Sequence, residues 1–158
     1  MAADGNDGSP VTSPAGPFWR RKTLEQMSDD EWESLCDHCG RCCLVKLEDE
    51  DSGEIHFTNV ACHLFNDEQC CCKDYQHRAE QVVDCLVLRP LTPALLAALP
   101  PTCAYRRLAE GRELEDWHPL LSGDPESVHR AAISVRGRVV SEEYIHPWQL
   151  EDHIISFQ

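Results

Sequence analysis

Long apolar runs are missing from this chain of 158 residues. Its most apolar stretch, residues 95–99, stops at a double proline and falls far short of the roughly 20 residues that a membrane-spanning helix needs. The first ten residues, MAADGNDGSP, are acidic and lack the basic-then-apolar layout of a secretory signal. We therefore expect a cytoplasmic protein with no membrane partner.

Basic side chains are scarce. The chain carries 14 Lys and Arg against 28 Asp and Glu, which gives a formal net charge of −14. Nucleic acids and anionic membranes are bound through clusters of Lys and Arg, so this balance predicts no nucleic-acid partner and argues against membrane surfaces. The same negative charge is compatible with binding cations.

Familiar catalytic motifs are also missing. The sequence has neither a glycine-rich phosphate loop nor a nucleophile elbow. Its ten cysteines make any single Cys–His catalytic pair hard to nominate. Whether the protein is an enzyme stays open at this point, and a non-catalytic role is favoured.

Cysteine, by contrast, is abundant, with ten residues in the first two thirds of the chain. In a reducing cytosol thiols stay free, so a dense cysteine pattern there indicates metal binding more than disulfides. The adjacent pair Cys42 and Cys43 and the run Cys70 to Cys72 would also be strained as disulfides between neighbours.

The stretch CDHCGRCC, residues 36–43, has the strongest metal-ligand spacing. In C-x-x-C two thiolates can bind one ion at about 2.3 Å from each sulfur. Cys36, Cys39 and Cys42 repeat this spacing, as in iron–sulfur proteins whose fourth ligand lies elsewhere in the chain. We expect Cys43 to point away from Cys42, toward a second metal or as a bridging thiolate.

Further candidate ligands follow the motif. Spacing favours Cys62, Cys70 and Cys72, whereas a lone cysteine in a helix-like segment, such as Cys85 or Cys103, is more typical of a small core residue. The sequence predicts a bystander at Cys71 and exposed side chains at His38 and His63, although both histidines are able to ligate. Thiolate ligands select zinc, Cu(I) or iron–sulfur clusters.

The pattern of residues predicts a small, mostly helical α+β domain with a short β-hairpin, organised around a cysteine metal cluster. Residues 1–17 are expected to be a disordered tail, and residues 18–158 a single cysteine-cluster metal-binding domain. A capping box at Ser28 to Glu31 opens a helix that ends near Cys36. Strands are predicted at 44–47, 54–57 and 133–140, and helices at 78–88, 93–99, 103–110, 124–131 and 146–155.

The whole arrangement resembles a known family. It combines CDHCGRCC with FTNVAC at 57–62, C-x-C-x-x-Y-x-x-R at 70–78, Asp84-Cys85 and TCAYR at 102–106. Over nearly all of residues 18–155 it is similar to the YcgN-like cysteine-cluster proteins, within the broader YkgJ-type CxxCxxCC group of zinc- or iron-chelating domains. The resemblance implies metal ligation by Cys36, Cys39, Cys42, Cys43, Cys62, Cys70, Cys72, Cys85 and Cys103.

One departure from the wider signature concerns Arg78, which matches its arginine while Tyr75 matches its tyrosine. That arginine is usually followed by proline, and here Ala79 follows. The site geometry of distant relatives therefore does not transfer directly. A relative, the flagellin lysine methylase group, shares the cysteine signature and implies iron–sulfur methyl transfer.

These observations predict a cytoplasmic protein that chelates zinc or iron, in the latter case also as an iron–sulfur cluster, through cysteine thiolates. Its partners would be metal ions, and its role metal handling or sensing. Two alternatives stay open: an iron–sulfur enzyme of redox or methyl-transfer type, and an interaction module with structural zinc. The sequence does not identify the metal, a substrate or a protein partner.

Overall fold

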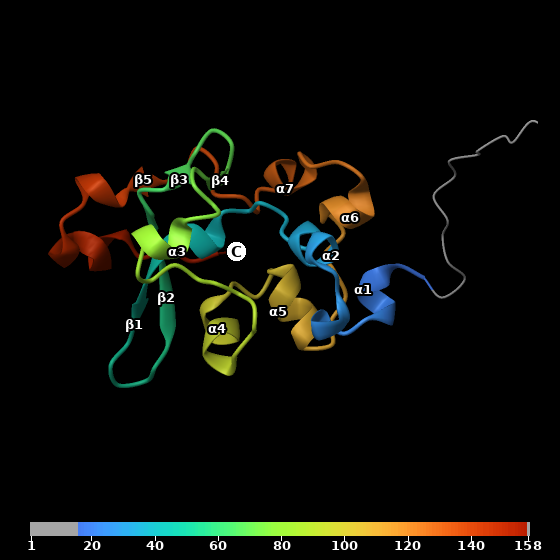
Figure 1. Cartoon of the computed structure of the whole chain (residues 1–158). Coiled ribbons are helices and arrows are strands. Elements are labelled where there is room, and N and C mark those ends of the chain that lie inside the picture. Colours follow the sequence, from blue (N-terminus) through green and yellow to red (C-terminus); the bar gives the residue numbers. More distant parts are fainter. Residues whose placement is uncertain (1–15, 158) are drawn as a thin grey trace, which may run out of the picture.

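The computed structural model describes residues 16–157, and it combines short helices with two small sheets (Figure 1). The predicted tail at 1–17 lies outside the described residues except for Gly16 and Pro17. In chain order the elements are α1 (Phe18–Arg21), η1 (Leu24–Gln26), α2 (Asp29–Ser34), η2 (Arg41–Cys43), β1 (Leu44–Glu48), β2 (Ile55–Ala61), β3 (Phe65–Asn66), β4 (Cys71–Cys72), α3 (Arg78–Gln81), α4 (Pro93–Ala98), α5 (Ala104–Ala109), α6 (Pro119–Ser122), α7 (Ser127–Arg130), β5 (Val140–Ser141), η3 (Glu142–Tyr144) and η4 (Pro147–His153).

Helix α2 begins at the predicted capping box. The Ser28 hydroxyl accepts a hydrogen bond from the Glu31 amide at 3.2 Å, and the Glu31 carboxylate accepts one from the Ser28 amide at 3.0 Å. The helix buries Trp32 and is followed by the fully buried Leu35, which fixes where the chain leaves the helix. Cys36 is the next residue, so capping and burial together set its position.

The predicted β-hairpin is confirmed. Strands β1 and β2 pair antiparallel around the acidic loop, and β5 adds to β2 as a short parallel strand. Strands β3 and β4 form a separate two-stranded pair, with Phe65 opposite Cys72. The cysteine-rich segment at 62–75, for which the sequence predicts irregular structure, therefore contains a small hairpin of its own.

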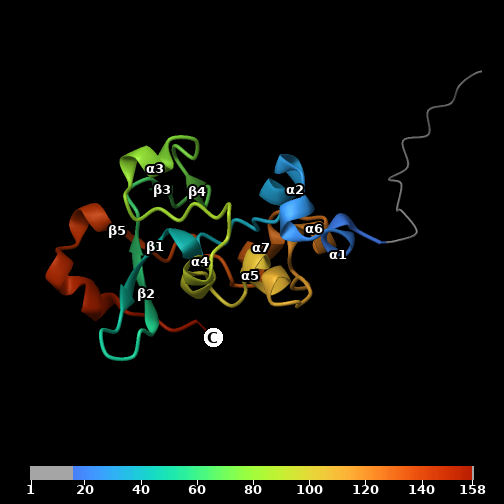
Figure 2. The same cartoon turned by 60° about the horizontal axis from the view of Figure 1, so that its bottom comes forward.

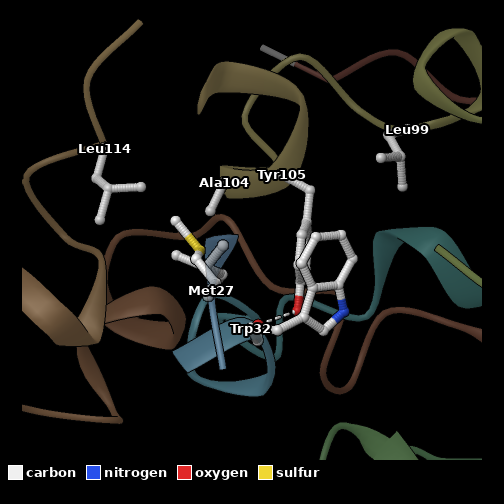
Figure 3. Packing of buried hydrophobic residues seen from close by; sticks show 7 residues of the cluster. Met27, Trp32, Leu99, Ala104, Tyr105 and Leu114 are labelled. Atoms are coloured by element: carbon white, nitrogen blue, oxygen red, sulfur yellow. Dashed lines mark hydrogen bonds between the residues drawn. The ribbon is translucent and has the colours of Figure 1, made fainter. Parts of the chain in front are cut away.

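Two hydrophobic clusters hold the described residues together. The helical cluster consists of Met27, Trp32, Leu35, Leu99, Ala104, Tyr105 and Leu114, and Figure 3 shows the Tyr105 hydroxyl donating a hydrogen bond to the Trp32 carbonyl at 2.6 Å. The sheet cluster consists of Leu44, Ala61, Phe65, Cys70 and Val135. In both views the sheet lies to one side and α1, α2, α5, α6 and α7 to the other (Figure 1 and Figure 2).

Residues 36–43 connect these two clusters. Cys36, at one end of the segment, packs against the helical cluster, and Cys43, at the other end, packs against the sheet cluster. Gly40 makes the intervening turn with φ +76, a left-handed conformation that glycine adopts without strain. The cysteine motif is thus the junction between the two packed parts.

Three predicted elements differ from the structure. The helix expected at 78–88 ends at Gln81, and the backbone is extended at Val82. Val82 and Val83 are both β-branched, which disfavours a helix, and Val83 is 98% exposed, so no packing against the core offsets that preference. The strand expected at 133–140 is mostly a turn, and only Val140 and Ser141 pair with β2. The closing helix is the 3₁₀ helix η4, which leaves Trp148 76% exposed.

The helices at 93–99 and 103–110 are confirmed with shorter bounds as α4 and α5, and that at 124–131 is reduced to α7. The small α+β architecture is also confirmed. Within the described residues, no helix combines the length and the apolar character needed to cross a bilayer.

Candidate metal centre

Four of the cysteines line one small cavity of about 50 Å³. Cys36, Cys39 and Cys42 enter it from the motif, and Cys103 enters from the far end of the cysteine region as the residue that precedes α5. We call Cys36, Cys39, Cys42 and Cys103 the first thiol group. Pro100, Leu99 and Tyr105 complete the wall opposite the motif, so the cavity lies where the motif meets the helical cluster.

Asp37 places a buried carboxylate in the same cavity. The residue is 6% exposed, and one carboxylate oxygen accepts a hydrogen bond from the Cys39 amide at 3.0 Å. The other oxygen, Oδ2, is buried and has no hydrogen-bond partner among the described residues. A buried anionic oxygen without a partner is costly, and a cation in the cavity would compensate it.

The surroundings of the first thiol group oppose ionisation of its buried members. Burial, followed by the charges of Cys42 and Asp37, raises the pKa of Cys36, and burial, Asp37 and Cys42 do the same for Cys39. Burial raises the pKa of Cys103 to about 12. Thiolates and a carboxylate sharing one cavity repel each other, and a bound metal cation would remove this repulsion.

A second thiol group consists of Cys43, Cys62, Cys72 and Cys85. The Cys62 amide donates a hydrogen bond to the Cys43 carbonyl at 2.9 Å, and the β3–β4 pair carries Cys72 close by. Burial raises the pKa of Cys62, and the charges of Glu142, Cys85 and Cys72 raise it further. These thiols therefore lie near enough to influence each other's ionisation.

The two groups meet at Cys42 and Cys43. A hydrogen bond from the Cys43 thiol, helped by the Lys46 ammonium and opposed by burial, lowers the pKa of Cys42 to about 7 and raises that of Cys43. Cys42 lines the first cavity, whereas Cys43 packs against the sheet cluster. Both residues belong to the 3₁₀ helix η2, in which successive side chains are about 120° apart rather than on opposite faces as in a strand.

Arg78 reaches the second group from α3. Its guanidinium lies 3.8 Å from the centre of the Tyr75 ring and donates to the Tyr75 carbonyl at 2.5 Å, while the Tyr75 hydroxyl donates to Glu33 at 2.9 Å. Burial raises the pKa of Cys85, and the Arg78 charge partly offsets that rise. The tyrosine and arginine of the sequence signature are thus neighbours in space, beside a candidate ligand.

Cys70 and Cys71 lie apart from both groups. Cys70 is 1% exposed, belongs to the sheet cluster, and has a pKa raised to about 11 by burial, with Asp67 and Arg136 as its charged neighbours rather than other thiols. Cys71 lies at 3.8 Å from the Gln69 side chain, to which its thiol donates. Of the nine predicted ligands, the structure brings eight into two groups and leaves Cys70 in a core.

Within residues 16–157, one set of three candidate ligand atoms lies within 4.8 Å of one another: Cys62, His63 and Glu142. His63 Nδ1 and Glu142 Oε1 are 2.6 Å apart, and the same carboxylate oxygen accepts from the His63 amide at 2.9 Å. The sequence predicts an exposed His63 and gives no signal for Glu142, because η3 joins Cys62 only through the fold. No three thiols of the described residues lie within 4.8 Å of one another.

Comparisons with known proteins agree with the cysteine pattern. A family model described as "CxxCxxCC: Putative zinc- or iron-chelating domain" matches residues 35–104, which contain all nine candidate ligands. The narrower YcgN-like assignment stays a prediction. No solved structure matches the chain.

Several relatives match most of the sequence. The UPF0260 protein of Nitrobacter hamburgensis is 60% identical over 140 residues, which cover 88% of this chain and 82% of the relative. That of Rhodopseudomonas palustris strain HaA2 is 57% identical over 93% of this chain and 87% of its own, and that of Sinorhizobium fredii is 54% identical over 89% and 91%. At these identities and coverages the chain belongs to the UPF0260 family.

Proposed function

We propose that this protein binds two soft metal ions, zinc or iron, one at each thiol group. The first ion would be held by Cys36, Cys39, Cys42 and Cys103, and the second by the second thiol group. The observation that carries the proposal is the first cavity, which four cysteines from two distant segments line together with Asp37, whose buried Oδ2 has no hydrogen-bond partner among residues 16–157.

The donor set supports this choice of metal. Four-coordinate sites with thiolate ligands suit zinc and iron–sulfur clusters, and eight thiolates complete two such sites. This assignment uses eight of the nine predicted ligands and treats Cys70 as a core residue, since its sulfur packs beside Phe65 and Val135. His63 and Glu142 offer further metal-ligand atoms beside Cys62, which would suit a coordination position whose ligand is exchanged as the ion enters or leaves.

Two features support a role in metal handling or sensing. Cys42 is the most exposed of the four residues in the first group, so its side of the cavity is the one by which an ion would enter or leave. The net charge of −14 concentrates cations around the chain. We place this handling in the cytoplasm, where thiols stay reduced.

Elemental analysis after anaerobic purification tests the proposal. About two zinc ions per chain are expected, or iron with sulfide and broad visible absorbance if the centres are iron–sulfur clusters. Replacing Cys103 with Ser should remove the first centre, and replacing Cys85 with Ser the second, whereas Cys71→Ser should leave both. A folded protein that contains no metal under these conditions would refute the proposal.

A structural role for the metal is the second candidate, favoured by the position of residues 36–43 between the helical and sheet clusters. An ion held by Cys36 and Cys103 would fix α2 against α5. Exchange with a chelating dye separates the two functions, because a handling protein should give up one ion to the dye while remaining folded. A structural centre should release metal only when the chain unfolds.

A further inference from the structure

A second cavity, of about 240 Å³, lies on the sheet side of the molecule, separate from the thiol-lined one. Arg41, Arg138 and Asn59 are among its lining residues, together with the apolar side chains of Val139 and Phe157. Among residues 16–157, no aspartate or glutamate lines it, although acidic residues outnumber basic ones two to one in the chain. The cavity therefore combines positive charge with apolar walls.

Arg41 is 4% exposed, so its charge is held almost entirely inside the protein. Its Nε donates to the Ile133 carbonyl at 2.8 Å, and Nη1 to the Thr102 hydroxyl at 3.4 Å. Within residues 16–157 neither Arg41 nor Arg138 has a carboxylate oxygen within 4.0 Å. Buried charges are normally paired, so a buried guanidinium without a carboxylate in direct contact is unusual.

The two guanidinium groups also repel one another. Both line the same cavity, so an anion between them would relieve their repulsion. The negative charges of Cys39 and Asp37 lie near Arg41 and account for it as a counter-charge to the first thiol group. They do not account for Arg138, which is exposed and approaches from the cavity side.

Contacts within the protein hold two of the cavity's hydrogen-bond donors, Arg41 and Asn59, in place. The Phe157 ring lies with its centre 3.9 Å from Arg41 Cζ, which holds the flat face of the guanidinium. The side-chain oxygen of Asn59 is engaged with His153 Nδ1 at 2.8 Å, which leaves its NH₂ group as a donor. Guanidinium groups bind carboxylates through two parallel hydrogen bonds, and the apolar walls suit a short hydrocarbon body.

We propose that this cavity binds a small organic carboxylate with a short apolar body, its carboxylate between Arg41 and Arg138 and its body against Val139 and Phe157. The cavity has a lining separate from that of the thiol-lined cavity and adds a ligand class that metal chelation does not require. The cavity adjoins the motif of residues 36–43, because its lining residue Arg41 stands between Cys39 and Cys42 in the sequence.

Isothermal titration calorimetry with benzoate on the full chain tests the proposal. Saturable binding is expected for the natural protein and should weaken by about tenfold or more in Arg138→Met, which removes one charge-assisted pair. Arg136→Met is the matched control, because Arg136 is also exposed, pairs with Glu126 at 3.0 Å and does not line the cavity. Its affinity for benzoate should be unchanged.

Two further probes define the ligand class. Benzyl alcohol, which has a similar shape without the charge, should not bind, and inorganic phosphate should not displace benzoate. The proposal is overturned if benzoate fails to saturate, if Arg136→Met weakens binding as much as Arg138→Met, if benzyl alcohol binds equally well, or if phosphate competes effectively. Amide signals of residues 133–139 should shift with benzoate in nuclear magnetic resonance spectra, and unchanged signals there would place any binding elsewhere.

Discussion

Gly40 stands where any side chain would collide with its surroundings. A Cβ atom there would lie 2.8 Å from both the Phe65 ring and a Val135 methyl, and 3.0 Å from the Cys70 sulfur. The residue also has φ +76, which side chains disfavour. This close approach lets the motif fold back against the sheet cluster, so the middle of CDHCGRCC is fixed by packing as well as by its cysteines.

We therefore predict that Gly40→Ala destabilises the protein by about 3 kcal/mol, the sum of a left-handed backbone and an overpacked core. Urea unfolding monitored by circular dichroism measures this. Gly53→Ala is the control, because Gly53 has φ +73 but a Cβ there would meet only a Glu48 carboxylate oxygen at 3.8 Å. The control should lose about 1 kcal/mol, and equal losses in both variants would contradict the role of close packing.

Cys70 gives a second test at this scale, because its neighbour Cys72 belongs to the second thiol group. Cys70→Ala should cost about 1 kcal/mol of stability through a small cavity in the sheet cluster, with metal content unchanged. Cys72→Ala should lower the metal content by one centre. Metal analysis of the two variants side by side decides the matter, and loss of metal from Cys70→Ala would make Cys70 a ligand.

At the scale of elements, the sequence predicted those helix starts and turns that depend on residues close together in the chain. The capping box at Ser28, the Thr92-Pro93 start of α4 and the hairpin of β1 and β2 all follow from residues a few positions apart. The segment after Gln81 was predicted as helix from its apolar spacing, yet it is extended at Val82 and then makes a turn in which the Cys85 amide donates to the Val82 carbonyl at 3.2 Å. The β-branched pair Val82 and Val83 disfavours the helix there.

The candidate metal centre likewise has ligands that local spacing predicts and ligands that only the fold brings together. Spacing alone brings together Cys36, Cys39 and Cys42, whereas the grouping with Cys103 requires α5 to pack against α2. No sequence pattern marks Glu142, because η3 reaches His63 only after the chain has crossed the sheet. Cys70 precedes β4 and has a left-handed backbone with φ 54, so it does not share a strand face with Cys72 as residues two apart in a strand would.

Ser28→Ala tests how much the start of α2 contributes. Loss of the hydroxyl that accepts from the Glu31 amide should lower the free energy of unfolding by about 1 kcal/mol. Asp30→Ala is the control within the same helix, because the Asp30 side chain is exposed and makes no hydrogen bond or ion pair with the described residues, and it should change stability by less than about 0.5 kcal/mol. Thermal unfolding measures both, and an unaffected Ser28→Ala would show that the cap is dispensable.

Across the whole molecule, the two hydrophobic clusters are joined where the thiol groups lie. Removing the metal should therefore loosen the contact between α2, α5 and the sheet, besides exposing thiols. With each ion present at about a hundred times its dissociation constant, about 2.7 kcal/mol of stability is lost per ion removed. We predict that chelation lowers the melting temperature by about 5 °C or more and that added zinc restores it.

Hydrogen exchange locates this effect. Amides of residues 36–43 and of the start of α5 should exchange faster after chelation, while those of β2 should stay protected by the paired strands. Uniform acceleration across all elements would instead indicate global unfolding. A melting temperature that does not move after verified metal removal would contradict a stabilising role for the ions.

The distance along the chain between Cys42 and Cys103 has a consequence for biosynthesis. If the first ion needs both residues, a nascent polypeptide on the ribosome cannot complete that coordination until α5 has emerged. The motif would then be translated early and wait with reactive sulfurs uncovered, so loading in the cell would have to follow translation of the helical half.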